Sequence, residues 1–162
     1  YYISSPVIMK LLEEKLPVDS LTVMVQKEAA VRICAAPGTR ACGAVSVAVQ
    51  YYSQPQILLD VPRDCFFPAP NVDSAVIRLN IRKEPPVKLE TEEKQFFKLV
   101  KAAFGQRRKT VLNSLSTGLG KPKEELSAAL QQAGIAPTAR AEQLTMEQFG
   151  TLCNLLFPNK TK

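Results

Sequence analysis

The stretch that governs the fold is FFPAPNVDSAVIRLNI, residues 66–81. From Asp73 onward it alternates apolar and polar side chains, and this period of two predicts a β-strand with one buried face. Ahead of the strand, two phenylalanines lie in a loop stiffened by Pro68 and Pro70. Large aromatic rings are usually buried, whereas proline-rich loops usually lie on surfaces. The stretch therefore predicts a strand entered through a loop that holds aromatic rings at its rim.

Helix and strand signals alternate on the N-terminal side of this stretch. We expect helices over 4–16, 27–36 and 44–52, and strands over 20–26, 56–62 and 73–81. Residues 44–52 suit either a strand or a helix, and we favour the helix. The run SLTVMVQ at 20–26 is apolar and β-branched enough to predict a strand buried on both faces. This alternation of helices and strands favours a mainly parallel sheet.

The C-terminal half shows a different pattern. Residues 82–90 resemble a linker, because they hold two adjacent prolines among charges. Beyond them the strand signals end, and helices are expected over 91–104, 106–115, 121–134 and 145–157. The last of these opens on a capping box from Thr145 to Gln148. We therefore predict an α/β portion over residues 1–86 and an all-α domain over 87–162.

Composition excludes several classes of chemistry. The chain has 162 residues, four cysteines without a C-x-x-C pair, and no histidine. Without imidazole, Ser-His-Asp and Cys-His nucleophile systems are excluded, and we expect no metal site. The cysteines are expected to be reduced thiols of a cytoplasmic protein, and no apolar run is long enough to cross a membrane. The opening YYISSPVIMKLL has no start methionine and no signal peptide, so we expect it to lie inside a longer protein.

Positive charge is concentrated in one window. Residues 94–123 hold eight basic residues and no acid, against a net charge of +6 for the whole chain. Such a window predicts a polyanion partner, although a merely solvated basic face is the alternative. On the first helix of the window, three lysines at i, i+4 and i+7 share one face, while Phe97, Val100 and Phe104 can pack inward. A basic triplet is expected to start the next helix. The candidate contacts are Lys94, Lys98, Lys101, Arg107, Arg108 and Lys109.

Two motifs carry a resemblance to a known family. YYISSP at residues 1–6 and FFPAPNVDSAVIRL at 66–79 resemble the KsgA family of ribosomal RNA adenine dimethyltransferases, relatives of the erythromycin-resistance rRNA methylases. In that family a strand ends in Asn-Leu-Pro-Tyr, whose tyrosine Tyr1 matches. VQKEAAVRI, AFGQRRKTVLNSL and LTMEQFGTLCNLL extend the likeness over nearly the whole chain, while Cys42 replaces an expected tyrosine. The later motif, Phe-x-Pro-x-Pro-x-Val-x-Ser, is matched by Phe66, Pro68, Pro70, Val72 and Ser74.

The resemblance implies the C-terminal half of a Rossmann-like methyltransferase domain, truncated at its cofactor-binding side, followed by a small helical RNA-binding domain. The implied reaction transfers methyl groups from S-adenosylmethionine to the exocyclic amine of adenines in small-subunit rRNA. No cofactor-binding residue is expected in this chain, so by itself it should be inactive. The implied partner is small-subunit rRNA or the pre-ribosomal small subunit. The protein is expected to be a monomer and to make no contact with a membrane.

The resemblance also gives the aromatic rings a role. An enzyme that acts on a base edge must hold the base unstacked, and aromatic faces supply about 1–3 kcal/mol per base. Tyr1 and Phe66 are therefore expected to form the two sides of a slot for the target base. The prolines of the loop lower the entropy cost of holding the ring. Phe67 should point the other way and pack against the core. The alternative is that both phenylalanines belong to the core.

Two other functions remain open. A non-catalytic RNA-binding or ribosome-assembly module would explain the basic window without catalysis. An unrelated basic DNA-binding protein would leave YYISSP and FFPAP unexplained. The stretch TGLGKP, residues 117–122, resembles a phosphate loop only superficially, because no strand precedes it and Pro122 stands where Ser or Thr is required.

Overall fold

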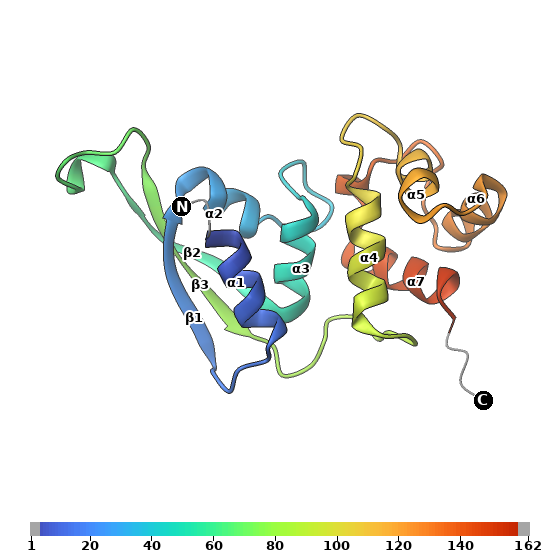
Figure 1. Ribbon diagram of the computed structural model, residues 1–162, viewed down its shortest axis with the longest axis horizontal. Helices are drawn as coiled ribbons and strands as arrows, with labels where there is room; N and C mark the ends of the chain where they lie inside the picture. The colour runs from blue at the N-terminus through green and yellow to red at the C-terminus, as the bar shows by residue number, and fades with distance from the viewer. Residues whose placement is uncertain (1–3, 159–162) are drawn as a thin grey trace. The chain divides into compact units, whose positions relative to one another are not determined.

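The computed structural model describes residues 4–158. The chain divides into two compact units, one formed by Tyr1–Ala36 with Val45–Pro85 and the other by Pro37–Ala44 with Pro86–Lys162. The first contains a sheet with helices, and the second is built from helices (Figure 1). Each unit has its own buried core.

The sheet of the first unit has three strands in the order β1-β3-β2. They are β1 (Ser20–Gln26), β2 (Ser53–Val61) and β3 (Ser74–Ile81). β3 lies in the middle and pairs antiparallel with both neighbours, so that Ile77 lies between Val23 and Ile57.

The expectation of a mainly parallel sheet is therefore wrong for the described residues. Helices do connect β1 to β2, and these two strands run in the same direction, but β3 lies between them. β2 returns to β3 through residues 62–73 without a crossover helix, and such a connection joins antiparallel strands. The helix–strand alternation predicted the elements correctly, but it did not reveal which strands are neighbours.

Three helices cover one face of this sheet: α1 (Ser4–Glu13), α2 (Lys27–Ile33) and α3 (Ala44–Tyr52) (Figure 1). Their apolar side chains, such as Ile33, form a core with Ile77 and Leu79, both of which are completely buried. Arg78, between them in sequence, is exposed. The alternation predicted for this strand is thus confirmed, and so is the helix over 44–52.

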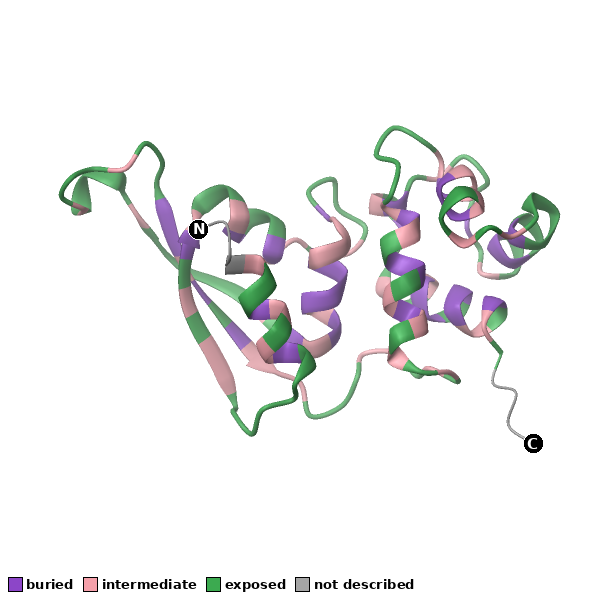
Figure 2. Ribbon diagram, viewed as in Figure 1, coloured by how far each residue is buried: buried purple, intermediate pink, exposed green. Residues whose placement is uncertain are grey.

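The opposite face of the sheet is largely open, which corrects the prediction that residues 20–26 form a strand buried on both faces. Met24 is 43% exposed and Leu59 is 53% exposed. Both are paired with Val76 in the register, so the three side chains form an apolar row across the sheet. The three helices of this unit lie on the other face, which leaves this row accessible in the described chain (Figure 2).

The second unit contains α4 (Glu93–Ala103), α5 (Val111–Leu119), α6 (Lys123–Gln132) and α7 (Met146–Leu156), with a short 3₁₀ turn, η2 (Ala141–Gln143). The predicted helices are confirmed, with the second starting later than expected. The capping box is also confirmed: Thr145 Oγ1 accepts from the Gln148 amide at 3.2 Å, and Gln148 Oε1 accepts from the Thr145 amide at 3.0 Å. Phe96, Leu99, Leu115, Leu126 and Phe149 are fully buried in its core.

The glycines of TGLGKP have structural roles. A Cβ at Gly118 would lie 2.6 Å from the Cβ of Ala102, so glycine is needed where α5 packs closely on α4. Gly120 ends α5 in the left-handed conformation at φ 65°, which favours glycine. Helix packing and capping therefore account for this stretch.

Within residues 4–158 no helix is both long enough and apolar enough to cross a membrane. The four cysteines are all free thiols.

Candidate functional site

The loop between β2 and β3, residues 62–73, is fixed at its base by Asp73. Its carboxylate oxygen Oδ1 accepts a hydrogen bond from the Arg63 amide at 2.8 Å, and its backbone carbonyl accepts from the Lys27 amide at 3.0 Å. Lys27 Nζ also lies 3.1 Å from Asp60 Oδ2. These contacts tie both ends of the loop to each other and to the start of α2. The 3₁₀ turn η1 (Arg63–Cys65) then leads to the two phenylalanines.

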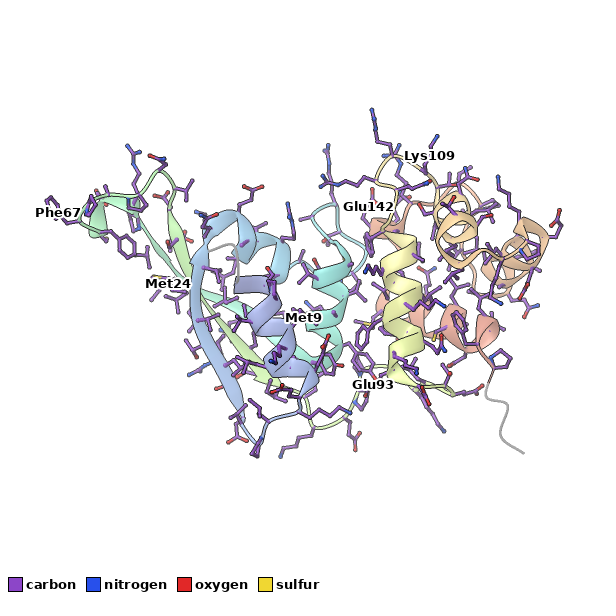
Figure 3. All side chains as sticks on the ribbon, in the orientation of Figure 1. Met9, Met24, Phe67, Glu93, Lys109 and Glu142 are labelled. Atoms are coloured by element: carbon purple, nitrogen blue, oxygen red, sulfur yellow. The ribbon has the colours of Figure 1, made fainter. Side chains whose placement is uncertain are left out.

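Phe66 and Phe67 have different environments within this loop. Phe66 is partly buried, whereas Phe67 is completely exposed and projects from the loop away from the sheet (Figure 3). The expectation that Phe67 packs against the core is wrong. The phenylalanines lie beyond the paired ends of β2 and β3, where the cluster of buried side chains does not extend.

The expected second wall of the base slot cannot be placed. Tyr1 lies outside the described residues. The pairing of Tyr1 with Phe66 across a slot therefore stays a prediction, and Phe66 is the one member of the pair whose position is given.

A hollow of about 420 Å³ lies at the foot of the loop. Two cationic residues, Lys27 and Arg63, contribute to it, and the ammonium of Lys27 is shared with Asp60. Sequence reasoning missed both residues. The available signal was their position along the chain. Lys27 directly follows β1, and Arg63 follows β2 by one intervening residue. Side chains just beyond the ends of neighbouring strands can meet at one edge of a sheet. The hollow is lined by Gln26, Lys27, Glu28, Arg63, Asn71, Val72 and Asp73.

The three lysines predicted on α4 are exposed, and they lie on the face away from the core. Lys94, Lys98 and Lys101 are all open to solvent, and Lys94 Nζ lies 3.5 Å from Glu92 Oε2 in a surface ion pair of little energetic weight. The exposed lysines and the buried residues of α4 form the two faces of an amphipathic helix.

The inward face predicted for α4 is one position out of register. Of the three residues expected to pack inward, Val100 is buried, while Phe97 and Phe104 are partly exposed. Phe97 instead packs edge-on against Phe96, with ring centroids 5.4 Å apart. Phe104 follows the end of the helix, and its ring centroid lies 5.9 Å from that of Phe149. The fully buried face of α4 consists of Phe96, Leu99, Val100 and Ala103.

Arg107, Arg108 and Lys109 do not start a helix, contrary to the prediction. They lie in the loop between α4 and α5, where the Lys109 amide donates to the Gln106 carbonyl at 3.1 Å in a turn. α5 begins later because Thr110 caps it, accepting a hydrogen bond from the Asn113 amide at 3.3 Å. All three basic side chains are exposed, and Figure 3 labels Lys109 on this loop.

Two of the thiols, Cys34 and Cys153, do not suit nucleophilic chemistry. Burial raises the pKa of Cys153 from 9.0 to about 11, and it also raises the pKa of Cys34. A raised pKa keeps a thiol protonated at neutral pH, and the thiolate is the reactive form. No group of three His, Cys, Asp or Glu side chains that could hold a metal ion lies within residues 4–158.

Comparison with known proteins places these features in a family. The model of the family described as "Ribosomal RNA adenine dimethylase" matches residues 1–157. Two proteins named ribosomal RNA small subunit methyltransferase A are similar: that of Geobacillus thermodenitrificans is 51% identical over 98% of this chain, and that of Alkaliphilus oremlandii is 55% identical over 96%. The chain spans about 55% and 54% of their lengths.

Solved structures agree with this placement. The dimethyladenosine transferase of Plasmodium falciparum superposes with a TM-score of 0.74 at 25% identity, covering 94% of this chain and 62% of that one. The 23S rRNA methyltransferase ErmE superposes with a TM-score of 0.68 at 26% identity, covering 96% of this chain and 62% of its own. The chain therefore belongs to the ribosomal RNA adenine dimethylase family, as its motifs suggested.

Proposed function

We propose that this chain is the RNA-recognising part of an enzyme that dimethylates the exocyclic amine of adenines in small-subunit rRNA. The observation that carries the proposal is the exposed basic face of the second unit, in a chain whose family modifies rRNA adenines. Because the chain spans about half the length of its relatives, the activity belongs to the full-length protein. Residues 1–86 would then form the C-terminal half of a Rossmann-like methyltransferase domain, and residues 87–162 the RNA-binding domain.

Residues 4–158 do not fit S-adenosylmethionine, because no glycine-rich turn joins a strand to a helix among them. A nucleotide cofactor of this kind is held by a glycine-rich turn between a strand and a helix. The glycine-rich stretch of this chain packs α5 on α4 and ends α5. We therefore assign the cofactor, which supplies the methyl group, to the part of the full-length relatives that this chain does not span. This chain alone would not catalyse the transfer.

Within the proposed enzyme, Phe66 stacks on the unstacked adenine. Its ring is partly exposed, and Asp73 fixes the base of its loop. Lys27 and Arg63 line the hollow beside the loop, but the carboxylates of Glu28 and Asp73 line it too. The contacts to flanking phosphates are therefore assigned to the basic residues of the second unit. Because the amine of adenine is a poor nucleophile, positioning contributes much of the rate. The enzyme would work as a monomer in the cytoplasm.

A chimera tests the proposal. This chain would be joined to the remaining part of the Geobacillus thermodenitrificans relative, which is 51% identical to it over the shared region. We expect the chimera to form dimethyladenine in unmethylated small subunits, detected by mass spectrometry of digested rRNA. The chain alone should form none, and calorimetry should detect no S-adenosylmethionine binding to it.

A non-catalytic RNA-binding or ribosome-assembly module is the second candidate, favoured by the same basic face. A folded chimera that binds the cofactor and the subunit but leaves the adenines unmodified, while the Geobacillus enzyme modifies them, would favour this module. Micromolar affinity of the chain alone for S-adenosylmethionine would contradict the assignment of the cofactor site.

A further inference from the structure

A second hollow, of about 230 Å³, lies along the solvent side of α5. Asn113, Ser116 and Thr117 are three and four residues apart, so they share one face of this helix. Lys109 reaches the hollow from the loop before α5, and Lys123 reaches it from the first residue of α6. Gln106 completes the lining, which holds no carboxylate.

The packing of α5 fixes which face forms the hollow. Val111, Ser114 and Leu115 are buried, and Gly118 packs against Ala102. The helix cannot rotate about its axis without losing these contacts. Its polar face therefore stays turned toward solvent, and Ser116 is further held by a hydrogen bond from its Oγ to the carbonyl of Lys121 at 3.4 Å.

The positive charge at the hollow is uncompensated. Among residues 4–158, neither Lys109 nor Lys123 forms an ion pair. The nearby Lys121 differs, because its ammonium lies 3.3 Å from Glu125 Oε1 and 5.6 Å from the ring of Phe157. Two free ammonium groups at one hollow favour an anion such as phosphate.

The neutral side chains of the hollow include hydrogen-bond acceptors, which need a donor on the ligand. The hydroxyl of Ser116 donates a hydrogen bond to the backbone carbonyl of Lys121, which leaves the hydroxyl oxygen free to accept one. The amide of Asn113 offers both a donor and an acceptor. The phosphate of a nucleic-acid backbone offers acceptors only, so it cannot satisfy these oxygens. A ribose 2′-hydroxyl is both donor and acceptor, and it lies within the same nucleotide as the phosphate.

We propose that this hollow binds the sugar–phosphate backbone of an RNA strand, with Lys109 and Lys123 on phosphates and with Asn113 and Thr117 on a 2′-hydroxyl. The hollow would thereby distinguish RNA from DNA. The proposal rests on the function proposed above and deepens it, because a basic face alone would bind both polyanions. It adds Asn113, Thr117 and Lys123 to the residues that contact RNA.

The test compares two probes of the same sequence, a 20-base-pair RNA hairpin and the matching DNA hairpin, at one salt concentration. We expect the chain to prefer RNA, and the variant Asn113→Ala/Thr117→Ala to lose about tenfold in RNA affinity, as for one or two hydrogen bonds, while its DNA affinity stays unchanged. Lys123→Ala should weaken both probes alike. Alanine has a higher helix propensity than either residue that it replaces, so α5 should remain folded.

The matched control is Ser127→Ala/Gln131→Ala, an exposed polar pair on α6 that does not line the hollow, which should change neither affinity. Equal affinity of the unaltered chain for the two hairpins, or an equal loss on both probes in Asn113→Ala/Thr117→Ala, would overturn the RNA preference while leaving the basic face intact. Failure to bind either hairpin would instead overturn the proposed RNA-recognising function, and the inference with it.

Discussion

The amide of Arg63 donates a hydrogen bond to the carboxylate of Asp73 at 2.8 Å, and this contact joins the two ends of the loop that carries Phe66. The residues are ten positions apart, at the end of β2 and the start of β3. Closing a loop at its base lowers the number of conformations of the residues between. The contact of Asp73, which lies within the family motif, therefore restricts where the ring of Phe66 can lie.

Asp73→Ala should loosen this loop. The variant removes the carboxylate that accepts a hydrogen bond from the Arg63 amide. At this exposed position we expect the free energy of unfolding to fall by about 1 kcal/mol, and proteolysis within residues 62–73 to become faster. Asp73→Asn keeps a carbonyl oxygen for the Arg63 amide, so it should stay close to the unaltered chain. Limited proteolysis followed by mass spectrometry measures the effect. Equal cleavage rates in all three proteins would show that the contact does not order the loop.

Phe66→Ala should slow methylation by the chimera. Loss of one stacking face removes about 1–3 kcal/mol, which is roughly a ten- to a hundredfold lower rate at subsaturating RNA. Phe67→Ala is the matched control, because that ring is completely exposed and the slot is assigned to its neighbour. We expect a nearly unchanged rate for the control and little change in melting temperature for either variant. A fall in melting temperature that accounts for the lost activity of Phe66→Ala would assign this ring to the core instead.

The cysteines should differ sharply in reactivity. Cys65 is exposed, whereas Cys153 is fully buried and has a pKa of about 11. At pH 8.5 iodoacetamide should label Cys65 rapidly and leave Cys153 unlabelled until the chain unfolds, as peptide mass spectrometry would show. Cys65→Ser should abolish the rapid phase. Labelling of Cys153 at the rate of Cys65 would contradict its burial.

The thiol of Cys153 makes the free energy of unfolding depend on pH. Its folded pKa lies above the unfolded value of 9.0, so between pH 9 and about 11 the unfolded chain releases a proton that the folded chain retains. Unfolding is therefore favoured progressively as the pH rises, and the contribution of this thiol is present below pH 9 and lost through about pH 11. Urea denaturation at pH 8.5 and 10.5 should show the decrease, and Cys153→Ala should reduce it.

Local signals predicted the elements well because the causes are local. The alternation over 73–81 matches the buried row of β3, and the capping box places the start of α7. The strand order could not be predicted in this way, because pairing depends on contacts between distant segments. The run at 20–26 illustrates the limit: its apolar side chains suit burial on both faces, yet Met24 is exposed in this chain.

The candidate site shows the same division. Exposure of the basic residues followed from charge, whereas the start of α5 depended on Thr110 taking the cap position, which moved Arg107–Lys109 into a loop. The environment of Phe67 was mispredicted because alternation was assumed to continue into a segment that is not a paired strand. Lys27 and Lys123 each line a hollow together with residues that are distant in sequence. Spacing along the chain does not reveal such neighbours.

The most direct test of the account is the salt dependence of RNA binding by this chain. Each phosphate contact in double-stranded RNA should contribute on the order of 0.9 to the slope of log affinity against log salt. Replacing Arg107, Arg108 and Lys109 together by alanine should weaken binding to small-subunit rRNA and flatten that slope by about two, as for the loss of two phosphate contacts. Lys10→Ala/Lys83→Ala, which removes two exposed charges of the first unit, should leave the slope unchanged. An unchanged slope in the triple variant would show that the basic loop is merely solvated and would contradict the RNA-docking role.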